Sequence, residues 1–228
     1  MKTETAVSIN IDKIDKNAVC QRLGYKGHSI PTSISSSVDS NIKSAYKLIK
    51  PRYAYVPKVI DSTLRQEVFM AGHLVFTSQT ITYVLSDCKW AVVFLVTIGG
   101  DLEREVSRLM EKEDMLNAFI LDTIGSEAVE KAADYLQDAV SETAKAIGYN
   151  TTLRYSPGYC DWDLSQQKII FQIIESTVLG VNLTESFMMI PRKSVSGVIG
   201  IGKFSKSKLP SCLRFNRKNS CQYKRTKL

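Results

Sequence analysis

The stretch KWAVVFLVTIG (89–99) is a near-continuous run of apolar side chains, rich in β-branched and aromatic residues. A run of this length and composition predicts a central β-strand that is buried on both faces. Gly99 and Gly100 then turn the chain into DLEREVSRLM (101–110), for which we predict a helix capped by Asp101. We therefore expect the sheet that contains residues 89–99 to form the centre of the fold.

Several helices are predicted around this strand. A long helix is expected at about 114–147, since apolar residues recur every three or four positions and Gly148 can end it. Shorter helices are predicted near Lys16–Leu23, within 38–50 before Pro51, over 78–87 behind a capping Ser78, and over 164–177. In the last of these, Asp163 is the expected cap and Gln166 stands in the capping-box position.

Further strands are predicted at 6–11, at 53–60 with a break at Pro57, and on both sides of Pro191 within 183–202. Helices and strands are interspersed without a regular β–α–β repeat, which favours an α+β fold on an antiparallel or mixed sheet. We expect one domain over residues 1–205 and a separate tail over 206–228.

The tail is distinguished by its charge. The chain of 228 residues has a formal charge of +7, yet no Asp or Glu follows Glu185, and eleven Lys and Arg lie beyond it. The rest of the chain holds 30 − 11 = 19 basic against 23 acidic residues. Such a tail could bind nucleic acid, an anionic cofactor or an acidic protein, or could simply be a solvated terminus.

Several classes of protein are disfavoured. No window of about 18 apolar residues predicts a membrane span, and the N-terminal residues lack the apolar core of a signal peptide, so we expect a cytoplasmic protein. Five cysteines without a secretion signal do not suggest a disulfide framework, and Cys212 and Cys221 lack the further ligands that a metal would need.

Enzyme motifs are also missing. The chain contains two histidines in unrelated contexts and no HExxH, GxSxG or P-loop. The glycines at 197, 200 and 202 lie in a strand pattern rather than before a helix. They therefore favour closely packed strands over a nucleotide-binding loop.

One composite pattern is more specific. Arg154-x-x-Pro157-Gly158-Tyr159 is followed by a predicted helix, then by GVNLTES (180–186), by Met189-x-Pro191 and by SVSG (194–197). In order and spacing this pattern resembles the activation domain of cobalamin-dependent methionine synthase. The resemblance implies an α+β domain with a twisted, mostly antiparallel sheet, flanking helices and a site for S-adenosylmethionine.

The resemblance also implies binding residues: Glu130, Arg154, Ser156, Gly158 and Tyr159, with Glu127 as the alternative to Glu130. Chemistry is compatible with these roles. The guanidinium of Arg154 can hold the ligand carboxylate, and Glu130 can meet the ammonium group or the ribose hydroxyls. Gly158 allows close backbone approach and Tyr159 offers an aromatic face. Taken without the motif, Arg154 is expected to form a helix-end salt bridge and Tyr159 to belong to the core; the downstream motif reverses this expectation.

The implied function is support for the reductive reactivation of a methionine synthase or another corrinoid methyltransferase, by methylation of cob(I)alamin. No catalytic residue and no metal ligand is expected, because the cobalt supplies the nucleophile. Cobalamin is expected on a partner chain, since the methyltransferase and cobalamin-binding modules do not occur in these 228 residues. The other implied partner is a one-electron donor such as a flavodoxin or ferredoxin, and no membrane partner is implied.

The chain departs from the family pattern at Cys160–Asp163 and after Gly197, where the family has a tyrosine-bearing stretch. The alternative function is a non-enzymatic binding protein whose basic tail docks an acidic partner or, less expected, nucleic acid.

Overall fold

The computed structural model of the chain describes residues 3–175 and 178–204. Its main sheet consists of β4 (Leu74–Thr77), β3 (Glu67–Met70), β2 (Arg52–Leu64), β5 (Cys88–Thr97), β9 (Ser194–Gly202) and β6 (Asn150–Thr151), in that spatial order, with β1 (Thr3–Ser8) paired to β2. Every pairing between these strands is antiparallel. The predicted α+β class with a mostly antiparallel sheet is confirmed.

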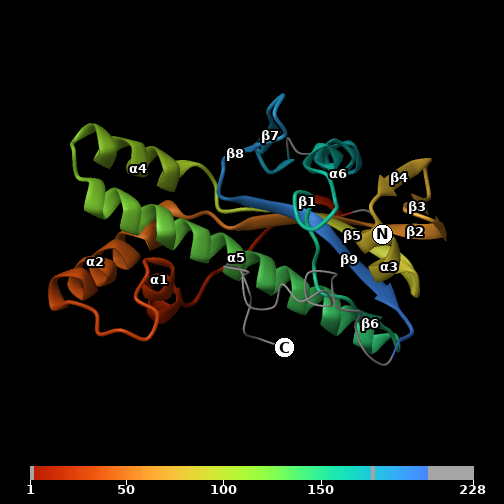
Figure 1. Cartoon of the computed structure of the whole chain (residues 1–228), viewed down its shortest axis with the longest axis horizontal. Helices are drawn as coiled ribbons and strands as arrows, with labels where there is room; N and C mark the ends of the chain where they lie inside the picture. The colour runs from red at the N-terminus through yellow and green to blue at the C-terminus, as the bar shows by residue number, and fades with distance from the viewer. Residues whose placement is uncertain (1–2, 176–177, 205–228) are drawn as a thin grey trace.

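Helices cover both faces of this sheet. They are α1 (Lys16–Arg22), α2 (Thr32–Leu48), α3 (Gln79–Leu85), α4 (Asp101–Glu111), α5 (Met115–Ala146) and α6 (Gln167–Ile173), with a 3-10 turn at Leu164–Gln166 before α6. A small second sheet pairs β7 (Asn182–Leu183) with β8 (Met189–Ile190). Figure 1 shows α5 running across the sheet, with α1, α2 and α4 gathered near its first half.

The side chains of β5 alternate between two hydrophobic cores. Phe94 and its even-numbered neighbours enter a core formed with α1, α2, α4 and α5. Val93 and Leu95 enter a second core formed with α3, α6 and Trp162. Because β5 pairs with β2 on one side and β9 on the other, it is the buried central strand that its sequence predicts.

The predicted ends of α5 are also confirmed. Asp114 is its N-cap and accepts a hydrogen bond from the backbone N–H of Asn117. Gly148, directly after the C-cap Ile147, has a φ of +76°, a conformation that glycine adopts without strain. The apolar spacing along the helix therefore located 32 helical residues correctly.

Pro57 does not break β2, contrary to our prediction. Strand β1 pairs with β2 as far as Tyr55, and β3 begins to pair with it at Ile60. Pro57 therefore lies in the gap between these two neighbours, while its other side faces Val92 of β5. A proline is tolerated where the strand edge needs no N–H donor.

Three further predictions about helix N-termini were wrong. Helix α2 begins at Thr32, several residues earlier than expected, because Ile34 packs on the first core despite the surrounding serines. Asp101 is the first residue of α4 rather than its cap, and its carboxylate pairs with Lys50 and Arg104. Gln166 forms no capping box; its Oε1 accepts hydrogen bonds from Thr77 N and Trp162 Nε1.

The glycines of β9 are close-packing positions, as their strand context predicts. A Cβ at Gly197 would lie 2.1 Å from the carbonyl oxygen of Tyr155, and one at Gly202 would lie 2.2 Å from that of Asp87. The backbone of neighbouring segments thus occupies the space that side chains would need. No helix among the described residues is both long and apolar enough to cross a membrane.

Candidate functional site

The segment after α5 lies along the free edge of β9. Asn150 and Thr151 pair with the end of β9 as β6, and Tyr155 exchanges backbone hydrogen bonds of 3.0 and 2.8 Å with Val198. This contact is possible only because Gly197 has no side chain. The pairing fixes the backbone on both sides of Arg154 against the sheet.

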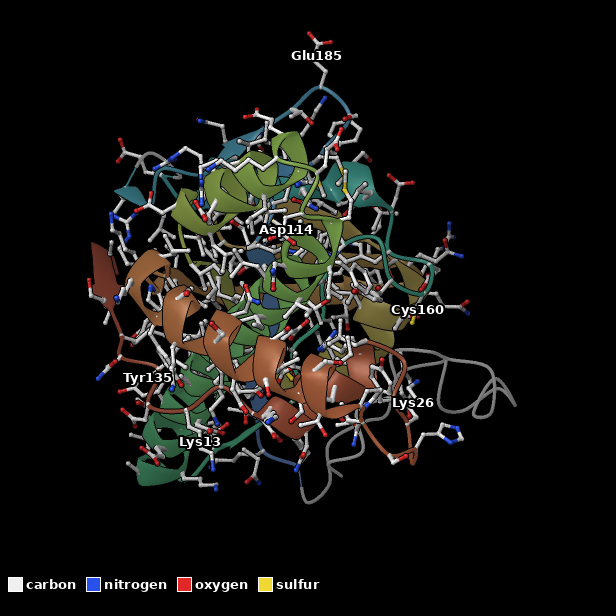
Figure 2. All side chains as sticks on the ribbon, turned by 90° about the vertical axis from the view of Figure 1, so that its left-hand side faces the viewer. Lys13, Lys26, Asp114, Tyr135, Cys160 and Glu185 are labelled. Carbon is white, nitrogen blue, oxygen red and sulfur yellow. The ribbon has the colours of Figure 1, made fainter. Side chains whose placement is uncertain are left out.

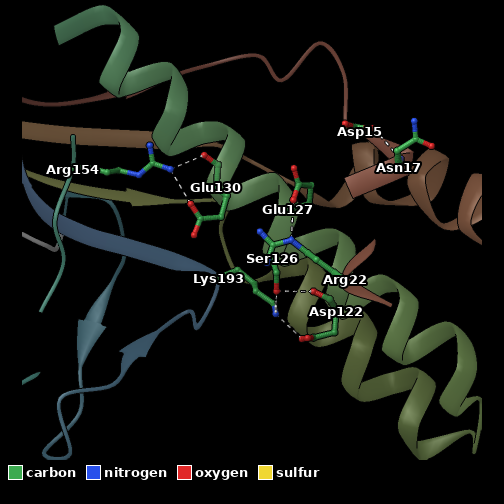
Figure 3. Close-up of polar contacts among 9 residues, drawn as sticks. All are labelled: Asp15, Asn17, Arg22, Asp122, Ser126, Glu127, Glu130, Arg154 and Lys193. Carbon is green, nitrogen blue, oxygen red and sulfur yellow. Dashed lines mark hydrogen bonds and ion pairs between the residues drawn. The ribbon is translucent and has the colours of Figure 1, made fainter. Parts of the chain in front are cut away.

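Arg154 points from this segment toward α5, where it meets two carboxylates; Figure 3 draws its contact with Glu130. Its Nη2 lies 2.8 Å from Oε2 of Glu130, and its Nη1 lies 2.6 Å from Oδ1 of Asp134. Arg154 is only 10% exposed, whereas Glu130 and Asp134 are 31% and 50% exposed. We call these three residues the Arg154 cluster.

A second ion-pair cluster lies two to three turns earlier on the same helix (Figure 3). Lys193, just before β9, places its Nζ 2.8 Å from Asp122 Oδ1 and 2.9 Å from Ser126 Oγ. Asp122, Ser126, Glu130 and Asp134 recur every fourth residue, so α5 presents one polar face to the segments that pass it. We call Lys193, Asp122 and Ser126 the Lys193 cluster.

The Pro-Gly turn that follows Arg154 is open to solvent. Pro157 is buried, whereas Gly158, Tyr159 and Cys160 are exposed, Tyr159 to 61%. Gly158 has a φ of +91°, and Cys160, labelled at the surface in Figure 2, has a φ of +56°. The half-buried Ser156 accepts a 3.4 Å backbone hydrogen bond from Tyr159.

The residues that follow the turn anchor it to the second core. The Trp162 ring meets Phe76 edge-on at 5.1 Å, and Asp161 accepts hydrogen bonds from Ser78 Oγ, Gln79 N and Thr80 N at the start of α3. Burial alone would raise the pKa of Asp161, but the hydrogen bonds from Thr80, Gln79 and Ser78 outweigh it and lower the pKa below its usual value. Cys160–Asp163, where the family motif differs, therefore has a structural role.

The segment thus brings two of the predicted site residues into direct contact. Glu130 and Arg154 form an ion pair, and Ser156, Gly158 and Tyr159 continue on the same segment. Glu127, the alternative to Glu130, instead binds Arg22 Nε at 2.9 Å. The reading of Tyr159 as a core residue is wrong, and Arg154 pairs with the middle of α5 rather than with a helix end.

Asp134 was missed by the sequence analysis. Its position four residues after Glu130 on a predicted helix was the available signal, because such residues lie on one face.

In the family, a tyrosine-bearing stretch follows Ser-Val-Ser-Gly. Here β9 continues through Gly202 and pairs with β5 and β6, so that stretch is replaced by paired strand.

The Arg154 cluster has the charges that an amino-acid group requires. A nearly buried guanidinium can bind a carboxylate through a planar pair of N–H donors, and an adjacent carboxylate can accept from an ammonium group. Within residues 3–175 and 178–204, no three His, Cys, Asp or Glu side chains gather closely enough to hold a metal ion. Cys212 and Cys221 lie outside the described residues.

Comparisons with known proteins agree with the motif. The sequence profile of the family described as vitamin B12 dependent methionine synthase, activation domain, matches residues 62–227. Among the solved structures that match is the crystal structure of the MetH reactivation domain bound to AdoHcy, with a TM-score of 0.68 over 90% of this chain and 80% of that one. At 16% identity this likeness shows a shared fold. No curated protein matches the sequence.

Proposed function

The chain belongs to the family of the vitamin B12 dependent methionine synthase activation domain, and from this we propose that it binds S-adenosylmethionine. In doing so it would support the reductive reactivation of methionine synthase or a related corrinoid methyltransferase. The corrinoid would be held outside these 228 residues. The AdoHcy bound to the similar MetH domain supports an adenosyl ligand of this class.

The observation that carries the proposal is the Arg154–Glu130 pair beside an exposed Pro-Gly turn. Arg154 is nearly buried and held by neighbouring backbone, so it can bind a carboxylate with little loss of side-chain freedom. Glu130 accepts hydrogen bonds only, which suits an ammonium group or a ribose hydroxyl. Together they match the charged end of S-adenosylmethionine.

The rest of the segment positions the ligand. Gly158 leaves the backbone of the turn accessible, and the exposed ring of Tyr159 can approach the sulfonium group. A reduced corrinoid on a partner chain would be the substrate that accepts the methyl group, with its electron coming from an external one-electron donor such as a flavodoxin or ferredoxin. The contribution of this chain is then orientation of the methyl donor rather than proton transfer.

Calorimetry with S-adenosylmethionine and S-adenosylhomocysteine tests the proposal. We expect binding to the wild type, and we expect Arg154→Ala to weaken it by about 1.5–3 kcal/mol, the range for a hydrogen bond to a charged group. Arg22→Ala is the matched control, because it breaks another arginine–glutamate pair, the one between Arg22 of α1 and Glu127 of α5. Absence of binding at millimolar ligand would refute the proposal.

Transfer itself needs a second assay. Single-turnover methylation of a corrinoid protein under reducing conditions should depend on Arg154 and not on Arg22. Methylation that proceeds equally with both variants would show that the methyl donor binds elsewhere. Any reduced corrinoid protein that accepts the methyl group can serve in this assay.

A further inference from the structure

We propose that Asp134 competes with the carboxylate of the ligand for Arg154, and so sets how tightly the site binds ligands that carry an amino-acid group. This inference rests on the proposed function, because it concerns the same site. It adds a selectivity-determining residue and a reason why the amino-acid group, rather than the adenosyl group, would control affinity.

The geometry of Arg154 carries the argument. A guanidinium holds a carboxylate best through two N–H groups from different nitrogens. Both terminal nitrogens of Arg154 are already engaged, Nη2 by Glu130 and Nη1 by Asp134. An incoming carboxylate that takes the terminal pair of nitrogens therefore competes with these two side chains for the same N–H donors.

Moving the carboxylate of Asp134 away from Arg154 costs less free energy than moving that of Glu130. Asp134 is 50% exposed against 31% for Glu130, so its carboxylate regains water when it moves. Arg154 Nη2 also lies 3.5 Å from the backbone carbonyl oxygen of Glu130, which keeps that side of the guanidinium close to the Glu130 turn of α5. Glu130 then remains beside Arg154, where it can accept the ammonium group.

The charges give the exchange a direction. One guanidinium faces two carboxylates, so the Arg154 cluster carries a formal net charge of −1 before any ligand arrives. A ligand carboxylate that joined without displacing Asp134 would face two like charges within a few ångströms. A ligand without a carboxylate, such as methylthioadenosine, requires no exchange, so its affinity should not depend on Asp134.

The experiment compares two ligands across two variants. Asp134→Asn keeps the size of the side chain and removes its charge, so we expect it to tighten S-adenosylhomocysteine binding by about three- to fivefold, the upper end of the scale for a partly exposed ion pair. Methylthioadenosine, which lacks the amino-acid group, should bind wild type and variant within about twofold. Asp134→Ser, a second variant, should act in the same direction.

Asp122→Asn is the control, since it removes a carboxylate from an ion pair on the same face of α5, three turns away. It should leave both affinities unchanged. Unchanged S-adenosylhomocysteine affinity in Asp134→Asn would overturn the inference, and weakened affinity would show that Asp134 binds the ligand ammonium instead. If the wild type bound neither ligand, the proposed function itself would be refuted.

Discussion

The two ion-pair clusters on α5 use the same polar face and differ in what holds the cation. In the Lys193 cluster the backbone of Lys193 is also fixed: its N–H donates to Glu103 Oε1 at 2.6 Å and its carbonyl accepts from Ile98 N at 3.2 Å. Lys193 thereby joins α4, α5 and the start of β9. In the Arg154 cluster, the guanidinium meets two partly exposed carboxylates and the chain continues into an open turn.

The two clusters show which features distinguish a structural ion pair from a candidate ligand site. Both cations are nearly buried, Lys193 to 12% exposure and Arg154 to 10%, so burial does not distinguish them. What distinguishes them is the kind of cation and the number of carboxylates that it meets, one for Lys193 and two for Arg154. Lysine is a point charge that one carboxylate and one hydroxyl satisfy here, whereas arginine presents a fork that can exchange one carboxylate for another.

The largest effect is expected where the Arg154 cluster depends on the sheet. Gly197→Ala would place a Cβ 2.1 Å from the Tyr155 carbonyl oxygen and 3.1 Å from the Phe94 ring, so the segment that carries Arg154 must move. We expect a loss of about 3 kcal/mol in the free energy of unfolding, together with loss of ligand binding. Urea denaturation and calorimetry measure the two effects.

Ser196→Ala is the control for this change. It adds no atoms at the neighbouring position and removes a buried hydroxyl that has no hydrogen-bond partner among the described residues. It should be neutral or slightly stabilising, because no hydrogen bond is lost and the hydroxyl no longer needs desolvation. A Gly197→Ala protein as stable as Ser196→Ala would contradict the close packing described above.

Lys193→Met should affect stability without affecting the ligand. The change leaves Asp122 and Ser126 without their cation, and we expect it to lower the free energy of unfolding by about 1–3 kcal/mol, less than for a fully buried pair because Asp122 is 37% exposed. Affinity for S-adenosylhomocysteine, measured well below the melting temperature, should stay unchanged. A specific loss of affinity would place Lys193 in the ligand site and remove the contrast between the clusters.

Asp161→Asn tests the anchor of the turn through its pH dependence. Because hydrogen bonds lower the pKa of Asp161 in the folded protein, its carboxylate stabilises the fold above the unfolded pKa of about 3.9. That stability is lost as the pH falls through the folded pKa. We expect the variant to be less stable than wild type by about 1 kcal/mol at pH 7, because hydrogen bonds to a neutral amide oxygen are weaker than those to a carboxylate.

The difference in the free energy of unfolding between wild type and Asp161→Asn should persist down to about pH 5. It should disappear below pH 4, as the wild-type carboxylate becomes protonated. Denaturation curves at several pH values measure it. Asp163→Asn is a useful comparison, since Asp163 caps the 3-10 turn on the other side of Trp162. A constant difference across the whole pH range would show that the charge of Asp161 is not what anchors the turn.

The smallest effect on stability is expected at Tyr159. Its side chain is 61% exposed, so Tyr159→Ala should change the free energy of unfolding by no more than about 0.5 kcal/mol. Under the proposed function, methyl transfer should fall more than ligand affinity, since Tyr159 would orient the methyl donor. A large loss of stability would instead indicate that the Tyr159 side chain packs in the core.

Sequence patterns predicted the long elements well and the contacts between distant segments poorly. The apolar run of β5 and the spacing of α5 each extend over ten residues or more, so local sequence determined them. The short hairpin of β3 and β4 was missed, because four-residue strands give too few alternations to stand out. The sequence signal that was overlooked is Gly72, which lies in the turn of this hairpin, where both Gly72 and His73 have a positive φ.

The motif named Arg154 and Glu130 as residues of one ligand site, and their role toward a ligand stays a prediction. Their side chains are in contact in the fold, although 24 residues separate them. The motif could not give Asp134, the anchoring role of Asp161 or the unbroken course of β2 through Pro57. Each of these depends on which backbone lies alongside, and that is decided by the sheet rather than by the local sequence.

The sharing of β5 by both cores has a consequence for how the protein unfolds. Loss of packing in either core would expose one apolar face of β5 and weaken the strand on which the other core also depends, and β5 is hydrogen-bonded on both edges. The two layers should therefore melt as one cooperative unit, with a single transition by fluorescence and by circular dichroism. The amides of Val93 and Phe94 should exchange with deuterium only through global opening, and so report the full stability of the domain.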